Sequence, residues 1–112
     1  MEKDYSNEVR EILKKYKKED IIFGKRLDPL MSRIKSNKQE VEEEILNCNN
    51  LSLTEKQNKS GEIRYRLYFL YSNKKGKGYV ITFRDTNLRI ITIFPLGRKT
   101  IKKYMKKGLN IP

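Results

Sequence analysis

The apolar side chains of the C-terminal half follow a period of two, and this pattern restricts the fold more than any other feature of the chain. In Ile63–Tyr71 and in Tyr79–Arg84 every second residue is apolar or aromatic. This pattern is typical of β-strands, in which successive side chains point to opposite faces of the sheet. Leu88–Phe94 is apolar on both faces apart from Arg89 and one threonine, which indicates a strand that is central or covered by a helix. We therefore expect an antiparallel meander that carries most of the core.

The segments around these strands contain turn-forming residues. Ser72–Gly78 is rich in Lys and Gly and is predicted to be a flexible hairpin loop, and Asp85–Asn87 is a tight-turn sequence. Leu51–Ser60 is polar and is predicted to be turn-like, and Pro95 and Gly97 are expected to end the last strand.

Helical periodicity begins near the N-terminus. Ser6–Lys18 has apolar residues at helical spacing and is predicted to be an amphipathic helix. Residues 1–19 either pack on the core or form a peripheral arm. Asp20–Phe23 is compatible with an edge strand or with the start of a helix.

Two short helices are expected next. Asp28 followed by Pro29 is typical of an N-cap with proline at the first helical position. Ser36–Gln39 resembles a capping box. Behind it, Val41 and Ile45 fall on one face of a helix that ends near residues 47–50.

Together these elements predict one α+β domain over residues 1–112. The N-terminal helices would pack on a small twisted antiparallel sheet of three or four strands, and Arg98–Lys107 would form a short basic C-terminal helix. The length of 112 residues agrees with a single domain, since domains commonly have about 100–150 residues.

The whole chain has a net charge of +12, and the positive charge is concentrated in its second half. Residues 61–112 carry thirteen Lys and Arg against two acids, whereas residues 1–60 carry thirteen against twelve. The solvated surface of a Lys-rich protein would mix both signs throughout, which describes the first half but not the second. We therefore expect the basic half to contact a polyanion, and nucleic acid is the one for which Lys and Arg contacts dominate affinity.

Composition excludes several classes of chemistry. The chain has no histidine and a single cysteine, Cys48, which excludes Ser–His and Cys–His catalysis and His-ligated metal sites. No metal and no cofactor is expected. No apolar run approaches the roughly 18 residues of a membrane span, and one cysteine is typical of a reducing compartment. We expect a cytoplasmic protein with no membrane partner, in which Cys48 is a small buried residue.

Arginine is notable within the predicted strands. Arg64 and Arg66 share one strand face, and Arg84 falls on the corresponding side of the next strand. A guanidinium can bind a phosphate bidentately, which an ammonium cannot do, and aromatic rings nearby can stack unpaired bases. The alternative is that these residues are only the solvent face of a half-buried sheet. The cations predicted from this pattern to bind nucleic acid are Arg64, Arg66, Lys99, Lys102, Lys103 and Lys106. Three further arginines belong to the same pattern: Arg84, Arg89 and Arg98. The tyrosines interleaved with these cations are Tyr65, Tyr68, Tyr71, Tyr79 and Tyr104.

The layout resembles the RelE/BrnT-like toxin fold and the small domains related to it. The matching stretches are IIFGKRLDPLMSRIKSNKQEVEEEIL, GEIRYRLYFLY, GYVITFRD and LRIITIFPLGRKTIKKY, which lie within residues 21–107. FGKRLDPLMSRIKSNKQEV is similar to the start of the family's first helix, and GRKTIKKY is similar to its ending, in which Arg and Tyr follow the last strand.

The resemblance implies a metal-independent endoribonuclease that acts on mRNA at the ribosome and is neutralised by an antitoxin. By position, Arg84 and Arg98 would contact the scissile phosphate, Tyr104 would be the acid or base, and Lys25 and Arg26 would bind RNA from the start of the helix. Arg26 stands where relatives often carry His, which retains phosphate binding and removes a general acid–base.

Three hypotheses follow from these patterns. The first is a RelE/BrnT-like ribonuclease or a degenerate, RNA-binding relative, with RNA preferred over DNA. The second is a non-catalytic nucleic-acid-binding module whose surface is the sheet together with Arg98–Lys107. The third is a protein-interaction domain whose basic face meets an acidic partner, such as an antitoxin tail.

Overall fold

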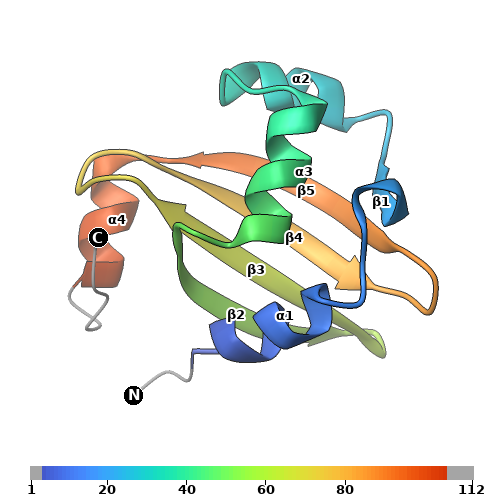
Figure 1. Ribbon diagram of the computed structural model, residues 1–112. Helices are drawn as coiled ribbons and strands as arrows, with labels where there is room; N and C mark the ends of the chain where they lie inside the picture. Colours follow the sequence, from blue (N-terminus) through green and yellow to red (C-terminus); the bar gives the residue numbers. More distant parts are fainter. Residues whose placement is uncertain (1–3, 106–112) are drawn as a thin grey trace.

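A five-stranded mixed β-sheet forms the centre of the structure, a computed structural model that describes residues 4–105 (Figure 1). The strands lie in the order β1-β5-β4-β3-β2, with β1 parallel to β5 and all other neighbours antiparallel. No helix in this range is long and apolar enough to cross a bilayer. The described elements are α1 (Ser6–Leu13), the 3-10 turn η1 (Lys18–Asp20), β1 (Ile21–Phe23), α2 (Leu27–Arg33), α3 (Lys38–Asn47), β2 (Leu51–Lys59), β3 (Glu62–Leu70), β4 (Gly76–Phe83), β5 (Leu88–Leu96) and α4 (Arg98–Met105).

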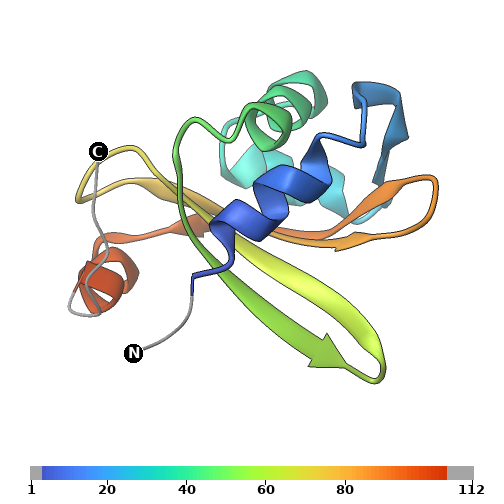
Figure 2. The same ribbon diagram turned by 60° about the horizontal axis from the view of Figure 1, so that its bottom comes forward.

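The α+β class is confirmed, but the sheet has five strands rather than three or four. Most of Leu51–Ser60, which the sequence predicts to be turn-like, is the strand β2. Its first residues are buried and its last are exposed, because the far end of the β2–β3 hairpin extends beyond the helices (Figure 2). A strand end with both faces in solvent carries polar residues without alternation, so the period-two signal is lost there. The other additional strand, β1, is only three residues long.

Three predicted boundaries also differ. The hairpin loop is shorter than Ser72–Gly78, because Gly76 already pairs with Leu96 in the ladder between β4 and β5. β5 continues through Pro95. β1 pairs only with the first residues of β5, Leu88 to Ile90, so one edge of β5 is unpaired at Pro95. A proline is tolerated on such an edge. α1 ends at Leu13 rather than at Lys18.

α2 and α3 begin at different residues than the sequence predicts. α2 starts at Leu27, so Asp28 and Pro29 lie inside its first turn, where a proline removes no intrahelical hydrogen bond. The N-cap of α3 is one residue later than predicted. It is Asn37, whose side-chain oxygen accepts a hydrogen bond from the Glu40 amide at 2.9 Å, and asparagine caps helices as well as serine does.

The helices α1, α2 and α3 cover one face of the sheet, and the main core lies between the two layers (Figure 2). α1 packs on this core through Val9 and Leu13, which are both buried, rather than extending as an arm. The other buried apolar residues of this core are Ile21, Leu27, Met31, Ile34, Val41, Ile45, Cys48, Leu51, Tyr65, Leu67, Phe69, Tyr79, Ile81, Leu88, Ile90 and Ile93.

Three of the tyrosines predicted to accompany the cations face this helical layer instead. Tyr79 is fully buried and donates a hydrogen bond to Glu44, and the Tyr71 hydroxyl donates to the same carboxylate. Burial together with the hydrogen bond to Glu44 raises the pKa of both hydroxyls. Tyr65 donates to Glu8 at 2.7 Å. These rings therefore lie on the helix-covered face of the sheet, opposite the face that carries Arg64 and Arg66.

The opposite face of the sheet is covered at one end only, by α4 (Figure 2). Ile101 of α4 is buried against a small second core. The strand residues of this second core are Leu53, Tyr68, Leu70 and Leu96, with Phe94 packed against it. The rest of this face is uncovered by any described helix.

Cys48, the C-cap residue that follows α3, is buried, as predicted. Burial raises the pKa of its thiol to about 11, above the value of about 8.5 for an exposed cysteine. The thiolate is the reactive form. We therefore expect iodoacetamide to alkylate Cys48 in the folded protein about 100-fold more slowly than free cysteine at pH 8.5. Mass spectrometry of quenched samples measures this rate. Equal rates for the folded protein and for free cysteine would contradict a protected thiol.

Candidate nucleic-acid interface

The uncovered face of the sheet carries charged side chains from its central strands. Arg64 and Arg66 alternate with core residues along β3, so both point to this face. The register places Arg66 opposite Val80 and Arg89 opposite Thr82. Val80 and Thr82 are two residues apart on β4 and therefore point to the same face. The strand pairing thus brings arginines from β3 and β5 to the same face.

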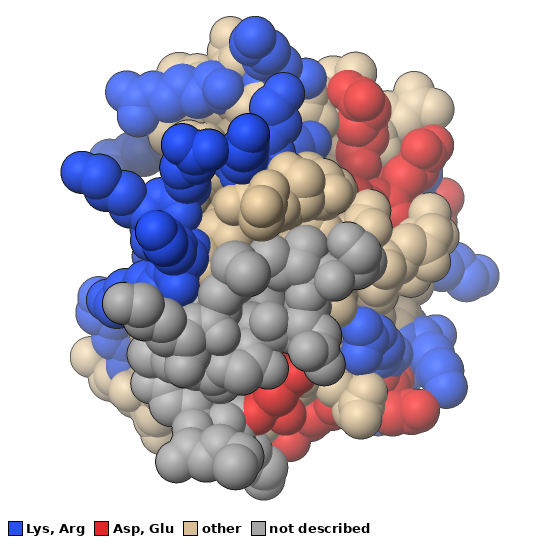
Figure 3. All heavy atoms as spheres, turned by 90° about the vertical axis from the view of Figure 1, so that its left-hand side faces the viewer, with Lys and Arg blue, Asp and Glu red and all other residues tan. Residues whose placement is uncertain are grey.

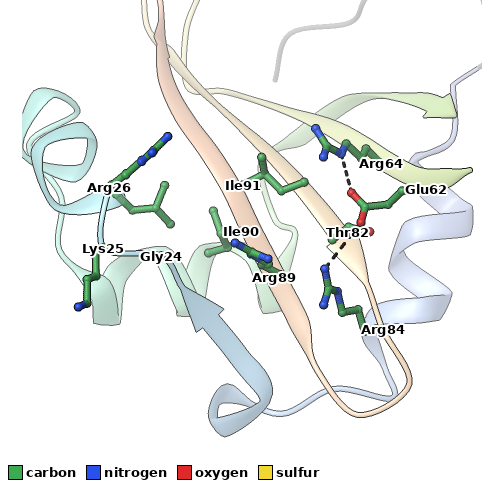
Figure 4. A pocket seen from close by; sticks show the side chains of 11 residues that line it. Gly24, Lys25, Arg26, Glu62, Arg64, Thr82, Arg84, Arg89, Ile90 and Ile91 are labelled. Carbon is green, nitrogen blue, oxygen red and sulfur yellow. Dashed lines mark hydrogen bonds and ion pairs between the residues drawn. The ribbon is translucent and has the colours of Figure 1, made fainter. Parts of the chain in front are cut away.

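An open pocket of about 510 Å³ lies on this face, between the loop after β1 and the strands β3, β4 and β5 (Figure 4). We call it the basic pocket. The cationic residues that line it are Lys25, Arg26, Arg64, Arg84 and Arg89.

Different parts of the fold position these cations. Arg64 and Arg89 lie on β3 and β5, which both have strand neighbours on each side. Arg84 begins the turn between β4 and β5, and its amide donates to the carbonyl oxygen of Asn87 at 2.8 Å. The Tyr16 hydroxyl donates a hydrogen bond to the carbonyl oxygen of Arg84 and so ties this turn to the segment after α1.

Glu62 is the only carboxylate among the described residues that line the basic pocket. Its Oε1 lies 2.7 Å from Nε of Arg64, and its Oε2 lies 3.7 Å from Nη2 of Arg84 (Figure 4). The hydrogen bond from Arg64, together with the charges of Arg64, Arg84 and Arg89, holds the pKa of Glu62 below its ordinary value. Glu62 is therefore ionised at neutral pH, and one negative charge among five cations leaves the pocket suited to an anion.

Beside the basic pocket, Arg66 lies against aromatic rings on the same face. Its guanidinium carbon is 4.7 Å from the ring centroid of Phe94 and 5.9 Å from that of Tyr68, within the range of cation–π attraction. Nε of Arg66 has no hydrogen-bond partner among residues 4–105. Phe94 is partly exposed, so this face offers a guanidinium plane and an aromatic ring, which are the groups on which unpaired bases stack.

A second group of cations lies at the other end of the sheet. The pairing of Gly76 with Leu96 brings the loop between β3 and β4 close to the start of α4. In Figure 3, which shows this end of the molecule, Lys and Arg gather on one side and most Asp and Glu on the other. We call the exposed cations of these two segments the α4 cluster, and they are Lys74, Lys75, Arg98, Lys99, Lys102 and Lys103.

The structure separates the two arginines that the family resemblance assigns to one scissile phosphate. Arg84 precedes β5 and Arg98 follows it, and this strand has nine residues. At about 3.3 Å per residue, the two arginines are roughly 30 Å apart along the sheet. One phosphate cannot contact both. The side chain of Tyr104 and the whole of Lys106 lie outside the described residues.

The remaining predicted residues fall into two separate groups. Lys25, Arg26 and Arg64 line the basic pocket with Arg84, and Arg66 lies beside it. The predicted cations of α4 belong instead to the α4 cluster, and they are Lys99, Lys102 and Lys103.

The sequence patterns do not predict that Glu62 takes part in the pocket. The available signal is the spacing of Glu62 and Arg64, because residues two apart in a strand share a face. Phe94 was also missed, and the signal there is Gly78, since a strand glycine often marks close approach by another group.

No group of three or more side chains of the His, Cys, Asp and Glu types stands close enough to hold a metal ion within residues 4–105. No protein-family model, curated protein or solved structure matches this chain. Its function must therefore be inferred from its own residues.

Proposed function

We propose that this protein binds single-stranded RNA through the uncovered face of its sheet. The observation that carries this proposal is the basic pocket, which is lined by five cations from β3, β5 and two loops and, among the described residues, by a single carboxylate. Phosphate groups suit such a site, because guanidinium groups form short, charge-assisted hydrogen bonds to phosphate oxygens. Acids are concentrated on the helical layer, where α3 alone carries Glu40, Glu42, Glu43 and Glu44, so RNA would approach the sheet from its uncovered side.

A single strand fits this face better than a duplex. Arg66 and the partly exposed ring of Phe94 lie next to the basic pocket. A base can stack on such groups only when it is unpaired, because the bases of a duplex stack on one another. RNA is preferred to DNA because of the resemblance of residues 21–107 to RelE/BrnT-like toxins.

A second candidate function, which the resemblance implies, is metal-independent cleavage of the bound RNA. It is favoured by the position of Arg84, the residue matched to a scissile-phosphate contact, in the basic pocket beside Arg64 and Arg89. Guanidinium groups there would stabilise the charge of a pentavalent phosphorane. Tyr104, which the resemblance assigns as the acid or base, belongs to α4 at the other end of the sheet, so this candidate leaves the proton transfer in the basic pocket unassigned. The ribosome and an acidic antitoxin-like protein are the partners that accompany this candidate.

The test is to incubate the purified protein with end-labelled, unstructured RNA in EDTA and to run native and denaturing gels. We expect a native shift whose affinity falls about 100-fold between 50 and 200 mM salt, as for four or five phosphate contacts on a single strand. No shift at low salt, or an affinity independent of salt, would contradict RNA binding. RNA fragments ending in a 2′,3′-cyclic phosphate would establish cleavage. Nuclease-resistant capture of one acidic protein would favour the protein-interaction hypothesis instead.

A further inference from the structure

The carboxylate of Glu62 lies among three guanidinium groups in the basic pocket. Its two oxygens face different arginines, with Oε1 at 2.7 Å from Arg64 and Oε2 at 3.7 Å from Arg84. Arg89 lies close enough for its charge to stabilise the same carboxylate. Three positive charges therefore surround one negative charge, and the arginines are not neutralised by their internal partner.

The fit between Glu62 and these arginines is incomplete. A charge-assisted hydrogen bond between nitrogen and oxygen is usually about 2.7–2.9 Å long. The contact with Arg64 meets this value, whereas the contact with Arg84 is about 1 Å longer. Arg84 is also the more exposed of the two, with 52% of its side chain accessible against 30% for Arg64.

A phosphodiester resembles this carboxylate in the features that matter here. It carries one negative charge on two equivalent oxygens, and its tetrahedral phosphorus allows further contacts with guanidinium donors. A group with this chemistry can form the hydrogen bond that Glu62 makes with Arg64. It can also shorten the contact with Arg84.

We propose that Arg64, Arg84 and Arg89 form a subsite for a single backbone phosphate of RNA, and that Glu62 is its internal occupant, which the phosphate displaces. This inference rests on the proposed RNA-binding function and adds the position of one phosphate. Glu62 would also determine which anions bind at this subsite, because an anion must compete with the Glu62 carboxylate for the arginines. A free phosphate ion should displace Glu62 less readily than an RNA strand does, because the strand makes additional contacts near the subsite.

Glu62 has room to leave this subsite. It is the first residue of β3, and its side chain is 34% exposed. The register places it directly opposite Lys59, whose side chain is also exposed. After displacement, the carboxylate can turn toward solvent and pair with Lys59, as opposite charges on facing strand positions do.

The test compares two variants that change the net charge equally. Glu62→Gln removes the internal occupant, and Asp85→Asn removes an exposed carboxylate next to Arg84 in sequence that does not line the pocket. We expect Glu62→Gln to tighten RNA binding at least about fivefold, since it removes a like charge from the phosphate position. Asp85→Asn should change the affinity less than about twofold. Equal effects of the two variants, or weaker binding by Glu62→Gln, would overturn the inference.

A second measurement separates failure of the subsite from failure of RNA binding. Inorganic phosphate is titrated into the wild-type protein while the ¹H–¹⁵N signals of the arginine Nε–H groups are followed by NMR. Displacement of Glu62 should shift the Arg64 signal, because its hydrogen-bond acceptor changes. A shift in a protein that does not bind RNA would refute the proposed function and retain the phosphate subsite. An unchanged Arg64 signal at saturating phosphate would overturn the subsite, whatever the RNA result.

Discussion

Replacing Arg64, Arg84 and Arg89 together by glutamine is expected to weaken the binding of single-stranded RNA about 100-fold at 0.1 M salt. Each guanidinium contributes about 1 kcal/mol or more when it hydrogen-bonds a phosphate, and three such losses combine to a factor of this size. The dependence of log affinity on log salt should also become shallower by about 0.7 unit, because the three arginines share one backbone phosphate, which is then no longer neutralised. Native gels or fluorescence anisotropy over a salt series measure both quantities.

The matched control replaces Lys14, Lys15 and Lys18 by glutamine. These exposed residues lie at the end of α1 and in the segment that follows, on the helical side of the sheet, and their replacement removes the same total charge. If affinity depends only on net charge, the two triple variants bind equally weakly and the basic pocket is not the interface. If the pocket is the interface, the lysine variant retains affinity within about threefold of wild type. Thermal unfolding of both variants checks that the fold is retained.

The sequence predicts the central strands well because each is half-buried along most of its length. β3 and β4 have one face in the main core, and this produces the alternation of apolar and polar residues. β2 is a strand for a different reason. Its outer half is held by backbone pairing with β3 from Glu55 to Lys59, and hydrogen bonds between peptide groups leave no pattern in the side chains.

Strand order and register also determine how much of the candidate site could be predicted. Alternation alone places Arg64 and Arg66 on one face of β3, and the structure agrees. It cannot show that Lys25 and Arg26 approach the same pocket, because this depends on the parallel pairing of β1 with β5. The sequence resemblance joins Arg84 and Arg98, but nine residues of extended strand separate them. Proximity between residues far apart in sequence is a property of topology, which periodicity does not specify.

The strand β5 connects the two cationic surfaces, which are the basic pocket and the α4 cluster. The basic pocket lies near the start of β5 and the α4 cluster follows its end, roughly 30 Å apart at about 3.3 Å per residue. An RNA strand lying along the uncovered face would pass Arg66 and Phe94 between them. Affinity should therefore rise with RNA length until the strand spans both surfaces.

Gly78→Ala is expected to destabilise the protein by about 2 kcal/mol and to lower its Tm by roughly 10 °C, as overpacking does in small domains. Gly78 lies in β4 opposite Phe94, and a Cβ built on it would lie 2.1 Å from two atoms of the Phe94 ring. The ring must then leave the strand surface, losing its contacts with Arg66 and Tyr68. Circular dichroism during thermal unfolding measures the change. RNA affinity should fall in the same variant, because the stacking surface beside the basic pocket is disrupted.

Gly97→Ala is the matched control for this effect. Gly97 also lies outside the left-handed region, and a Cβ there would meet no atom within 4 Å, so its Tm should stay within about 2 °C of wild type. A double-mutant cycle identifies the cause. In a Phe94→Ala background the clash at position 78 no longer exists, and Gly78→Ala should then cost less than about 0.5 kcal/mol. If the cost of Gly78→Ala is the same in both backgrounds, the ring of Phe94 is not what requires glycine at this position.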